Sequence, residues 1–230
     1  MNTGTSLIHS QNGLITTIGY QLKDQPPIYS LEGSVSIVGS GLNWLVQNLK
    51  IVNSNKELDE FASKVEDNGG VYCVPSFSGL FAPYWNSKSK GVLVGLTLHS
   101  NNSHIARAMI EGICFQIDEV INAMEKDSNI NIHKIKVDGG VTNLHLLLQT
   151  QSDLLNLKIE KSDYSELTAF GAAICAGIGV GKFKSLKDIP QTQKKSLFFE
   201  PQISKEKREK MIQNWKIAIK IAQLTSSFQQ

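Results

Sequence analysis

GGVYCVPSFSGLFAPYW, at residues 69–85, is the stretch that decides the fold, and GVLVGLT follows it at residues 91–97. A β-rich run ends there in a corner of glycine, proline and aromatic residues, and a second strand-like run comes after it. Such a corner needs glycine where φ is positive or where two backbones approach closely, and proline where φ is fixed. The pattern predicts strands near Val71–Pro75 and Val92–Leu96, one on each side of the corner.

Strand signals also occur on both sides of this region. Gly13–Tyr20 and Ile28–Leu31 are rich in β-branched and apolar residues, and Asp24–Pro27 between them has turn chemistry. These three segments predict an antiparallel hairpin. Lys134–Asp138 and Lys158–Lys161 predict two further strands downstream.

Six segments predict helices, most of them with apolar residues at three- and four-residue spacing. They are Glu32–Leu49, the short polar segment Lys56–Val65, a long helix capped by Asn102 or Ser103 and ending near Met124, Thr142–Leu155, Glu166–Gly179 and the amphipathic Lys205–Leu224. The segment Glu166–Gly179 is dense in alanine and glycine, which suits close packing on a sheet. Hairpin strands followed by alternating strands and helices predict a mixed α/β sheet with helices on its faces.

Composition excludes several classes of function. The chain has 230 residues, 41% of them hydrophobic and 19% charged, as is ordinary for a globular protein. Its net charge of +2 is too small to indicate a nucleic-acid partner. We expect no signal peptide, because the first residues lack a basic region followed by an apolar core. Ala169–Gly181 is too short and too rich in glycine to span a bilayer.

The three cysteines, Cys73, Cys114 and Cys175, are far apart and lie in apolar runs. We therefore expect buried, reduced thiols in a cytosolic protein. The five histidines show no metal-binding spacing, so we expect no metal–histidine site. Glu111 and Gln116, on an otherwise apolar helix, are expected to form buried hydrogen bonds.

Two glycine-containing segments are candidates for ligand binding. Asp138-Gly139-Gly140 lies at a strand-to-helix junction, where glycines let backbone amides approach a ligand and a helix N-terminus favours phosphate-like charge. Tight strand–helix turns use the same residues without a ligand. VGSGLNW at residues 38–44 can likewise be explained without a ligand, because its glycines can serve helix packing and Trp44 suits a core.

The corner also carries a family resemblance. GL-x-APYW at residues 79–85, followed by a basic residue, a glycine and a GLT strand, resembles the C-terminal lobe of glycerol kinases, members of the FGGY carbohydrate kinase family. NGLITT at residues 12–17 and YSLEGS at residues 29–34 favour glycerol kinases over xylulose or gluconate kinases. Two residues depart from the family: Lys90 stands in place of the usual arginine, and Asn86 in place of the usual acid.

The resemblance implies a ribonuclease-H-like, actin-type ATPase fold, in which two lobes clasp ATP. The chain is then one such lobe, an α/β unit whose mixed sheet has flanking helices. Residues 1–195 are expected to form the lobe, and residues 196–230 an amphipathic helix packed on it. The last helix, with Trp215 and Ile219, is expected to rely on contacts from the other lobe.

The resemblance also implies four nucleotide-binding residues, Gly39, Asn43, Gly140 and Asn143. Asn43 stands where the family commonly has glutamine. The family places a base-contacting asparagine four residues beyond the glycine that matches Gly140, and that position is Leu144 here. One residue on a helix is a rotation of about 100°. Either the loop is shortened and Asn143 substitutes, or the contact is lost.

No residue of the chain matches the family's catalytic machinery. In the family the catalytic aspartate, the glycerol-binding groups and a Gly-Thr-Gly phosphate loop precede the point that aligns with Met1. The resemblance therefore implies ATP with Mg²⁺ as co-substrate of the complete enzyme, no metal site in the chain itself, and glycerol binding only with an N-terminal lobe. We expect these residues to be inactive alone.

Three functional interpretations follow. The first is the C-terminal lobe of a glycerol kinase, from a truncated gene, a fragment or one half of a split enzyme. The second is a lobe of another FGGY sugar or polyol kinase, and the third is a non-catalytic nucleotide-binding or oligomerisation module. The expected partners are ATP or ADP, together with a complementary N-terminal half or a second copy, in the cytoplasm.

Overall fold

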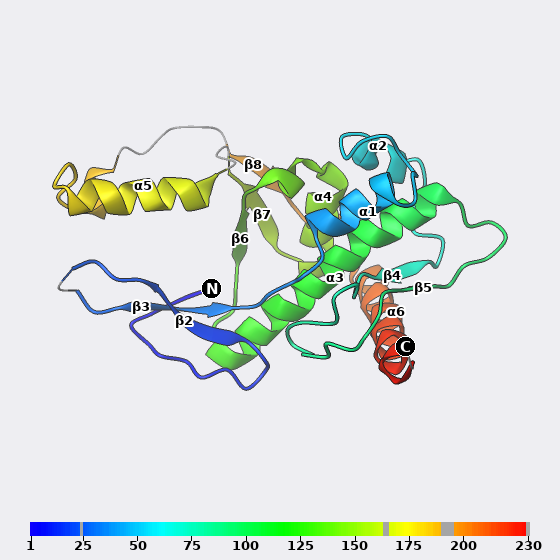
Figure 1. The fold of residues 1–230 in the computed structure, drawn as a ribbon, viewed down its shortest axis with the longest axis horizontal. Coiled ribbons are helices and arrows are strands. Elements are labelled where there is room, and N and C mark those ends of the chain that lie inside the picture. The colour runs from blue at the N-terminus through cyan, green and yellow to red at the C-terminus, as the bar shows by residue number, and fades with distance from the viewer. Residues whose placement is uncertain (24, 163–165, 190–195, 229–230) are drawn as a thin grey trace.

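The structure is a computed structural model that describes residues 1–23, 25–162, 166–189 and 196–228. Figure 1 shows a rounded body of helices on one side and, on the other, an arm made of a β-hairpin below and a single helix above. The expected turn at Asp24–Pro27 lies in part outside the described residues, because Asp24 is among those left out.

The described strands form three small sheets. One has the order β1-β3-β2, the second pairs β4 with β5, and the third has the order β6-β7-β8. All pairings are antiparallel except that of β6 with β7, so the strands are mixed, as predicted. Their bounds are β1 Asn2–Gly4, β2 Ile15–Tyr20, β3 Ile28–Glu32, β4 Tyr72–Val74, β5 Val92–Val94, β6 Lys134–Val137, β7 Lys158–Lys161 and β8 Leu197–Phe199.

The described α-helices number six, and three short 3₁₀ turns lie before α4, after α5 and after α6. They are α1 Gly39–Gln47, α2 Leu58–Ala62, α3 Asn102–Ser128, α4 His145–Leu155, α5 Leu167–Gly179 and α6 Lys205–Leu224. Helix α2 is shorter than the expected Lys56–Val65, and α3 extends past the expected end near Met124. Two helices begin at least three residues later than expected. The helix expected from Glu32 begins only at Gly39. The segment before it packs closely on α3, because a Cβ on Gly33 would lie 2.3 Å from Val120 Cγ1. The helix expected from Thr142 begins at His145, after a 3₁₀ turn at Gly140–Asn143.

The long helix α3 is the centre of the core. Asn101 caps it, and the ring of His104 closes the capping box by accepting from the Asn101 backbone N–H. Met109, Ile110 and Ile113 in its middle are fully buried, and so are most of their neighbours on every side of the helix. A helix that is apolar on all sides is stable only when it is surrounded. Here α1, α2, α4 and β4 surround it.

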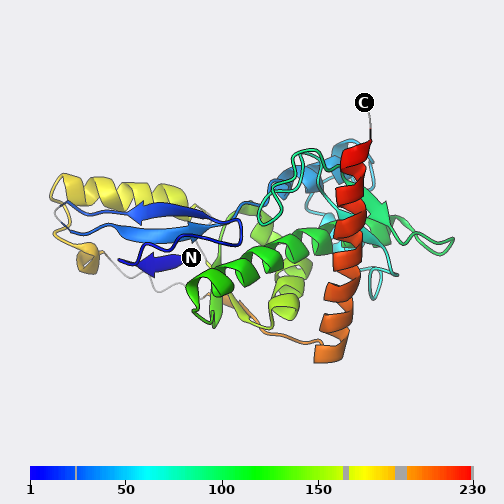
Figure 2. The ribbon, with the colours of Figure 1, turned by 90° about the horizontal axis from the view of Figure 1, so that it is seen from below.

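The C-terminal helix α6 crosses α3 and packs on this lobe itself (Figure 2). Trp215 is 1% exposed and stacks on Phe115 of α3, with ring centroids 4.9 Å apart. Ile219 is also buried. The expectation that Trp215 and Ile219 rely on another lobe is therefore wrong. The neighbouring Ile217 and Ile221, on the opposite side of α6, are exposed.

The Gly/Pro/aromatic corner is confirmed. Gly79 has φ +91° and Trp85 has φ +49°, and a Cβ on Gly79 would lie 2.7 Å from the backbone of Ser87. The Ser76 hydroxyl donates to the carbonyl of Lys90 at 2.6 Å and closes the loop. The corner thus places β4 and β5 side by side, with β4 fully buried.

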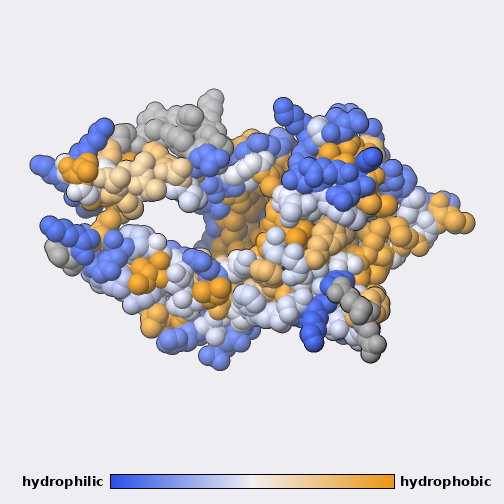
Figure 3. Space-filling view, in the orientation of Figure 1, coloured by the Kyte–Doolittle hydropathy of each residue, from blue (hydrophilic) through white to orange (hydrophobic). Residues whose placement is uncertain are grey.

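Helix α5 differs most from its prediction. It forms over the expected range, but none of its residues is buried, whereas its composition suggested close packing on a sheet. Cys175, on α5, is exposed, so the expectation of three buried thiols holds for Cys73 and Cys114 only. Figure 3 shows an opening between α5 and the hairpin of β2 and β3.

The stack of Trp215 on Phe115 generates a stability prediction. Trp215→Ala should lower the free energy of unfolding by about 3–5 kcal/mol, because it leaves a cavity against α3. Ile217→Ala, on the exposed side of the same helix, should cost less than about 1 kcal/mol. Urea unfolding of both variants measures this difference. Equal costs would mean that α6 is not held by α3.

Two buried carboxyls generate a prediction about pH. Burial raises the pKa of Glu119 to about 7 and that of Asp118 to about 6, from ordinary values of 4.5 and 3.8. Tyr84 donates a hydrogen bond to Glu119, whereas Trp215 Nε1 has no hydrogen-bond partner among the described residues. The folded state holds these protons more tightly than the unfolded chain. Stabilisation is therefore complete below about pH 4 and is lost as the pH rises to about 7.

Glu119→Gln keeps an acceptor for Tyr84 but cannot titrate. The wild type should lose about 3–4 kcal/mol of stability between pH 5 and pH 8, and the variant should lose clearly less. Thermal unfolding across this range measures the difference, with Glu60→Gln at an exposed position as the control. Parallel curves for all three proteins would contradict the assignment.

Candidate functional site

One pocket of the body brings together all four predicted site residues. Its volume is about 460 Å³, and it lies between α1, the loop before α2, and the turn that follows β6. Gly39, Asn43, Gly140 and Asn143 line it, although about 100 residues separate the two pairs in sequence. The other lining residues are Leu42, Asn55, Lys56, Asp59, Val141 and Leu144.

The pocket's glycines are not explained by packing. A Cβ on Gly140 would meet nothing within 4 Å, and one on Gly39 would meet only Val141 Cγ2, at 3.8 Å. Gly139 has φ +95°, so the turn itself requires glycine at that position. The Thr142 hydroxyl donates to the Gly139 carbonyl at 2.6 Å and fixes the turn. Gly140 therefore presents open backbone to the pocket.

The two asparagines are oriented by neighbours. Asn55 Nδ2 donates to Asn43 Oδ1 at 2.5 Å, and Lys161 Nζ donates to Asn143 Oδ1 at 2.9 Å. Each amide oxygen accepts one of these bonds, which orients the side chain, and the NH₂ group of each asparagine can then donate to a ligand. The site is thus rich in donors and suits a ligand with acceptor atoms, such as ring nitrogens or hydroxyl oxygens.

The structure also bears on the one-residue offset between Asn143 and Leu144. Leu144 is 6% exposed and belongs to the core, whereas Asn143 is exposed and lines the pocket. The 3₁₀ turn ends at Asn143, before α4 begins. Of the two residues, Asn143 is therefore the one that offers a polar group.

Sequence reasoning missed three polar residues of the pocket. Asn55, Lys56 and Asp59 come from a short polar segment that carries no recognisable motif. The Asp59 carboxylate accepts from the Leu146 backbone N–H at 2.8 Å, which ties α2 to the first turn of α4. Only the three-dimensional arrangement identifies them.

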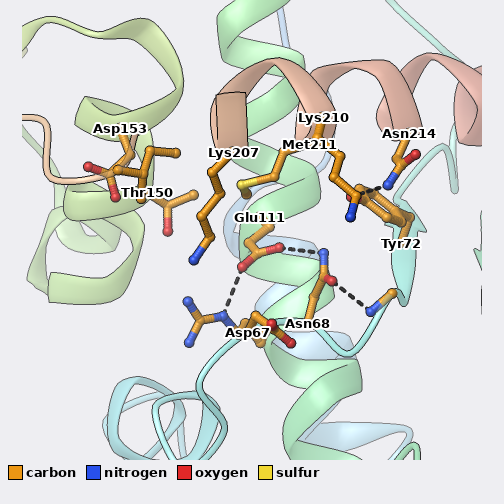
Figure 4. Close-up of a pocket in the computed structure, with 13 residues that line it drawn as sticks. Asp67, Asn68, Tyr72, Glu111, Thr150, Asp153, Lys207, Lys210, Met211 and Asn214 are labelled. Carbon is orange, nitrogen blue, oxygen red and sulfur yellow. Dashed lines mark hydrogen bonds and ion pairs between the residues drawn. The ribbon is translucent and has the colours of Figure 1, made fainter. Parts of the chain in front are cut away.

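A second hollow, of about 240 Å³, lies where the turn before β4 meets α3, α4 and α6 (Figure 4). Glu111 lies at its centre and accepts from Arg107 Nε and Asn68 Nδ2, both at 2.8 Å. Burial raises the pKa of Glu111, and Arg107 opposes that shift. Because these groups satisfy one another, we assign them a structural role. The expectation of a buried hydrogen bond is confirmed for Glu111, but Gln116 Nε2 has no partner among the described residues.

Two kinds of feature are absent from the described residues. No group of three or more His, Cys, Asp or Glu side chains is placed to hold a metal ion. No described helix combines the length and the apolar character needed to cross a membrane.

Comparisons with known proteins all match the chain to one family of kinases. Residues 1–180 match the model of the C-terminal domain of the FGGY family of carbohydrate kinases. A glycerol kinase of Clavibacter michiganensis is 48% identical over 95% of this chain, and a probable glycerol kinase of Dictyostelium discoideum is also 48% identical over 95%. These matches cover 43% and 40% of the two relatives, so the chain spans less than half of their length.

Solved structures of kinases also match the chain. The crystal structure of Plasmodium falciparum glycerol kinase with ADP matches with a TM-score of 0.86 and 36% identity, over 100% of this chain and 45% of that one. A ligand-bound xylulose kinase of Lactobacillus acidophilus matches with a TM-score of 0.75 over 94% of this chain and 42% of that one, but at 21% identity it shows the fold alone. The expected actin-type ATPase fold is confirmed.

Proposed function

The chain belongs to the FGGY family of carbohydrate kinases, and from that membership we propose that it is the C-terminal, nucleotide-binding lobe of an ATP-dependent glycerol kinase. The reaction is transfer of the terminal phosphoryl group of ATP to glycerol, which gives ADP and glycerol 3-phosphate. The observation that carries the proposal is the convergence of Gly39, Asn43, Gly140 and Asn143 on one pocket. We assign this lobe to a cytoplasmic enzyme.

The pocket suits the base and ribose of the nucleotide. Open backbone at Gly140 lets a flat ring approach closely, and the NH₂ groups of Asn43 and Asn143 can donate to ring nitrogens or hydroxyls. Asn55 and Lys161 act as positioning residues, because each occupies the oxygen of one asparagine. Lys56 is the cation among the residues that line the pocket.

The remaining parts of the reaction belong to the other lobe of the complete enzyme. Phosphoryl transfer needs the phosphates and Mg²⁺ held, and an acceptor hydroxyl aligned with a base. In this proposal Mg²⁺ is carried on the ATP phosphates, and glycerol is bound only when an N-terminal lobe faces this one. Glycerol is favoured over other polyols because the relatives at 43–48% identity are glycerol kinases.

These 230 residues alone should not phosphorylate glycerol. Loss of a positioned base costs about 10²–10⁴ in rate, and loss of substrate orientation can cost about 7–11 kcal/mol more. A coupled assay with purified protein, ATP, Mg²⁺ and glycerol measures this. Turnover above about 1 s⁻¹ that survives repurification would contradict the division of labour between two lobes.

Nucleotide binding by these residues alone should be weak and insensitive to the phosphates. We expect ATP and adenosine to bind with similar dissociation constants near or above the millimolar scale, which is about −4 kcal/mol. Calorimetry with both ligands measures this, with Gly140→Trp to fill the pocket and Gly171→Trp, at an open site on α5, as the matched control. Micromolar ATP binding that Gly140→Trp abolishes would mean that the lobe holds the phosphates itself.

A further inference from the structure

A third hollow, of about 410 Å³, lies between α3, α6 and the Gly/Pro/aromatic corner. Glu119 of α3, Trp215 of α6 and Tyr84 of the corner line it, and Figure 2 shows the two helices crossing. It is separate from the nucleotide pocket, because the two share no lining residue in the described part of the chain. Its volume lies within the range of small-molecule sites, about 300–1,000 Å³.

Two polar groups on the wall of this hollow lack a partner among the described residues. Trp215 is 1% exposed, and its Nε1 donates no hydrogen bond. Glu119 Oε1 accepts from the Tyr84 hydroxyl, but the second carboxyl oxygen, Oε2, is buried and has no partner. In the hollow around Glu111, by contrast, both carboxyl oxygens accept a hydrogen bond. Buried polar groups without partners are unfavourable, so the hollow suits a group that satisfies both.

A hydroxyl group satisfies both. Its oxygen accepts from the Trp215 N–H, and its proton is donated to Glu119 Oε2. An ammonium group cannot accept, and a carbonyl or ether oxygen cannot donate, so each of these would leave one group unsatisfied. A hydroxyl also fits both ionisation states of Glu119, because it can accept from a carboxylic acid as well as donate to a carboxylate.

The remaining wall suits further hydroxyls on a short carbon skeleton. Asn122 Nδ2 donates to Asp118 Oδ2 at 3.0 Å, and the Oδ1 atoms of both residues can still accept. Pro83, Tyr84 and Ile212 add apolar surface against which C–H groups can pack. Sites for small molecules combine such apolar walls with a few well-placed polar groups.

The charges around the hollow favour a neutral ligand. Asp118 and Glu119 line it, and so do Lys126 and Lys216, which are both exposed. Burial raises the pKa of both carboxyls, and the positive charge of Lys216 partly opposes the shift in each. Two lysines are thus balanced by two carboxyls. A phosphate group would be attracted by the first pair and repelled by the second.

We propose that this hollow binds a small neutral ligand with several hydroxyl groups, a polyol or a sugar, and that one hydroxyl joins Trp215 Nε1 to Glu119 Oε2. The site is distinct from the place where an N-terminal lobe would hold glycerol for phosphorylation, and the inference does not depend on the proposed function. Because the ligand contacts both α3 and α6, it also stabilises the packing of α6 on the lobe.

The indole N–H signals of ¹⁵N-labelled protein test the proposal. The chain has three tryptophans, and Trp215→Phe identifies the signal of Trp215. Titration of the full 230-residue chain with sorbitol or glucose should move this signal saturably and leave that of Trp44, which lies outside the hollow, in place. The control is 1,2-dimethoxyethane, which has acceptor oxygens but no O–H. It should bind about tenfold more weakly.

A pair of α6 variants locates the site. Lys216 and Lys220 are exposed lysines one helical turn apart, and of the two only Lys216 lines the hollow. Lys216→Trp should weaken binding about tenfold or more, because an indole at that position narrows the entrance. Lys220→Trp removes the same charge and should bind within about twofold of the wild type. Gly140→Trp, which fills the nucleotide pocket, should leave the Trp215 response unchanged.

Three results would overturn the proposal. The first is a Trp215 signal that neither sorbitol nor glucose moves, which would mean that Trp215 and Glu119 are satisfied without a ligand. The second is equal binding by Lys216→Trp and Lys220→Trp, and the third is an equal response to the ether and to the hydroxylated probes. A response to sorbitol alone or to glucose alone would support the proposal and identify the class of ligand.

Discussion

The close approach of other backbones to helix α3 is the constraint on which the rest of the structure depends. A Cβ on Gly112 would lie 2.1 Å from the Cys73 carbonyl oxygen, so β4 rests directly on the helix. On its other sides Gly41 brings α1 to Met109, and Gly33 brings the segment after β3 to Val120. Because interiors are packed at near-crystalline density, a methyl group at Gly112 would force β4 away from the helix, and one at Gly41 or Gly33 would press on the side chain of Met109 or Val120.

The pocket depends on this arrangement. Helix α1 is held on α3 through Gly41, and α4 is held on α3 through residues such as Leu147, whose carbonyl lies 3.4 Å from the Cys114 sulfur. The first turn of α1 and the turn before α4 therefore meet at a fixed place. Gly39, which is half-buried, and Gly140, which is exposed, are thus supported by packed helices, which is the arrangement that keeps a binding site open to its ligand.

Many of the helices and strands could be predicted from the sequence, and there are physical reasons why the others, and some of the pocket residues, could not. The period of apolar residues and the Gly/Pro corner were sufficient for α6, the hairpin and the β4–β5 pair, because these signals are local. The strands β1 and β8 were missed, since three residues of Asn2–Gly4 or Leu197–Phe199 carry no period. Asn55 and Asp59 were missed because contact across the pocket, and not spacing, brings them to the site. The exposure of α5 could not be read from its composition, which is that of a packed helix.

We propose that the pocket between Gly39 and Gly140 receives the base and ribose of a nucleotide. Titration of ¹⁵N-labelled protein with millimolar adenosine, followed by amide chemical shifts, tests it most directly. We expect saturable shifts at residues 39–43 and 140–143, absent in Gly140→Trp, and none at the hollow around Glu111. Shifts centred on residues 67–72, or no shifts at residues 140–143 at saturating adenosine, would contradict it.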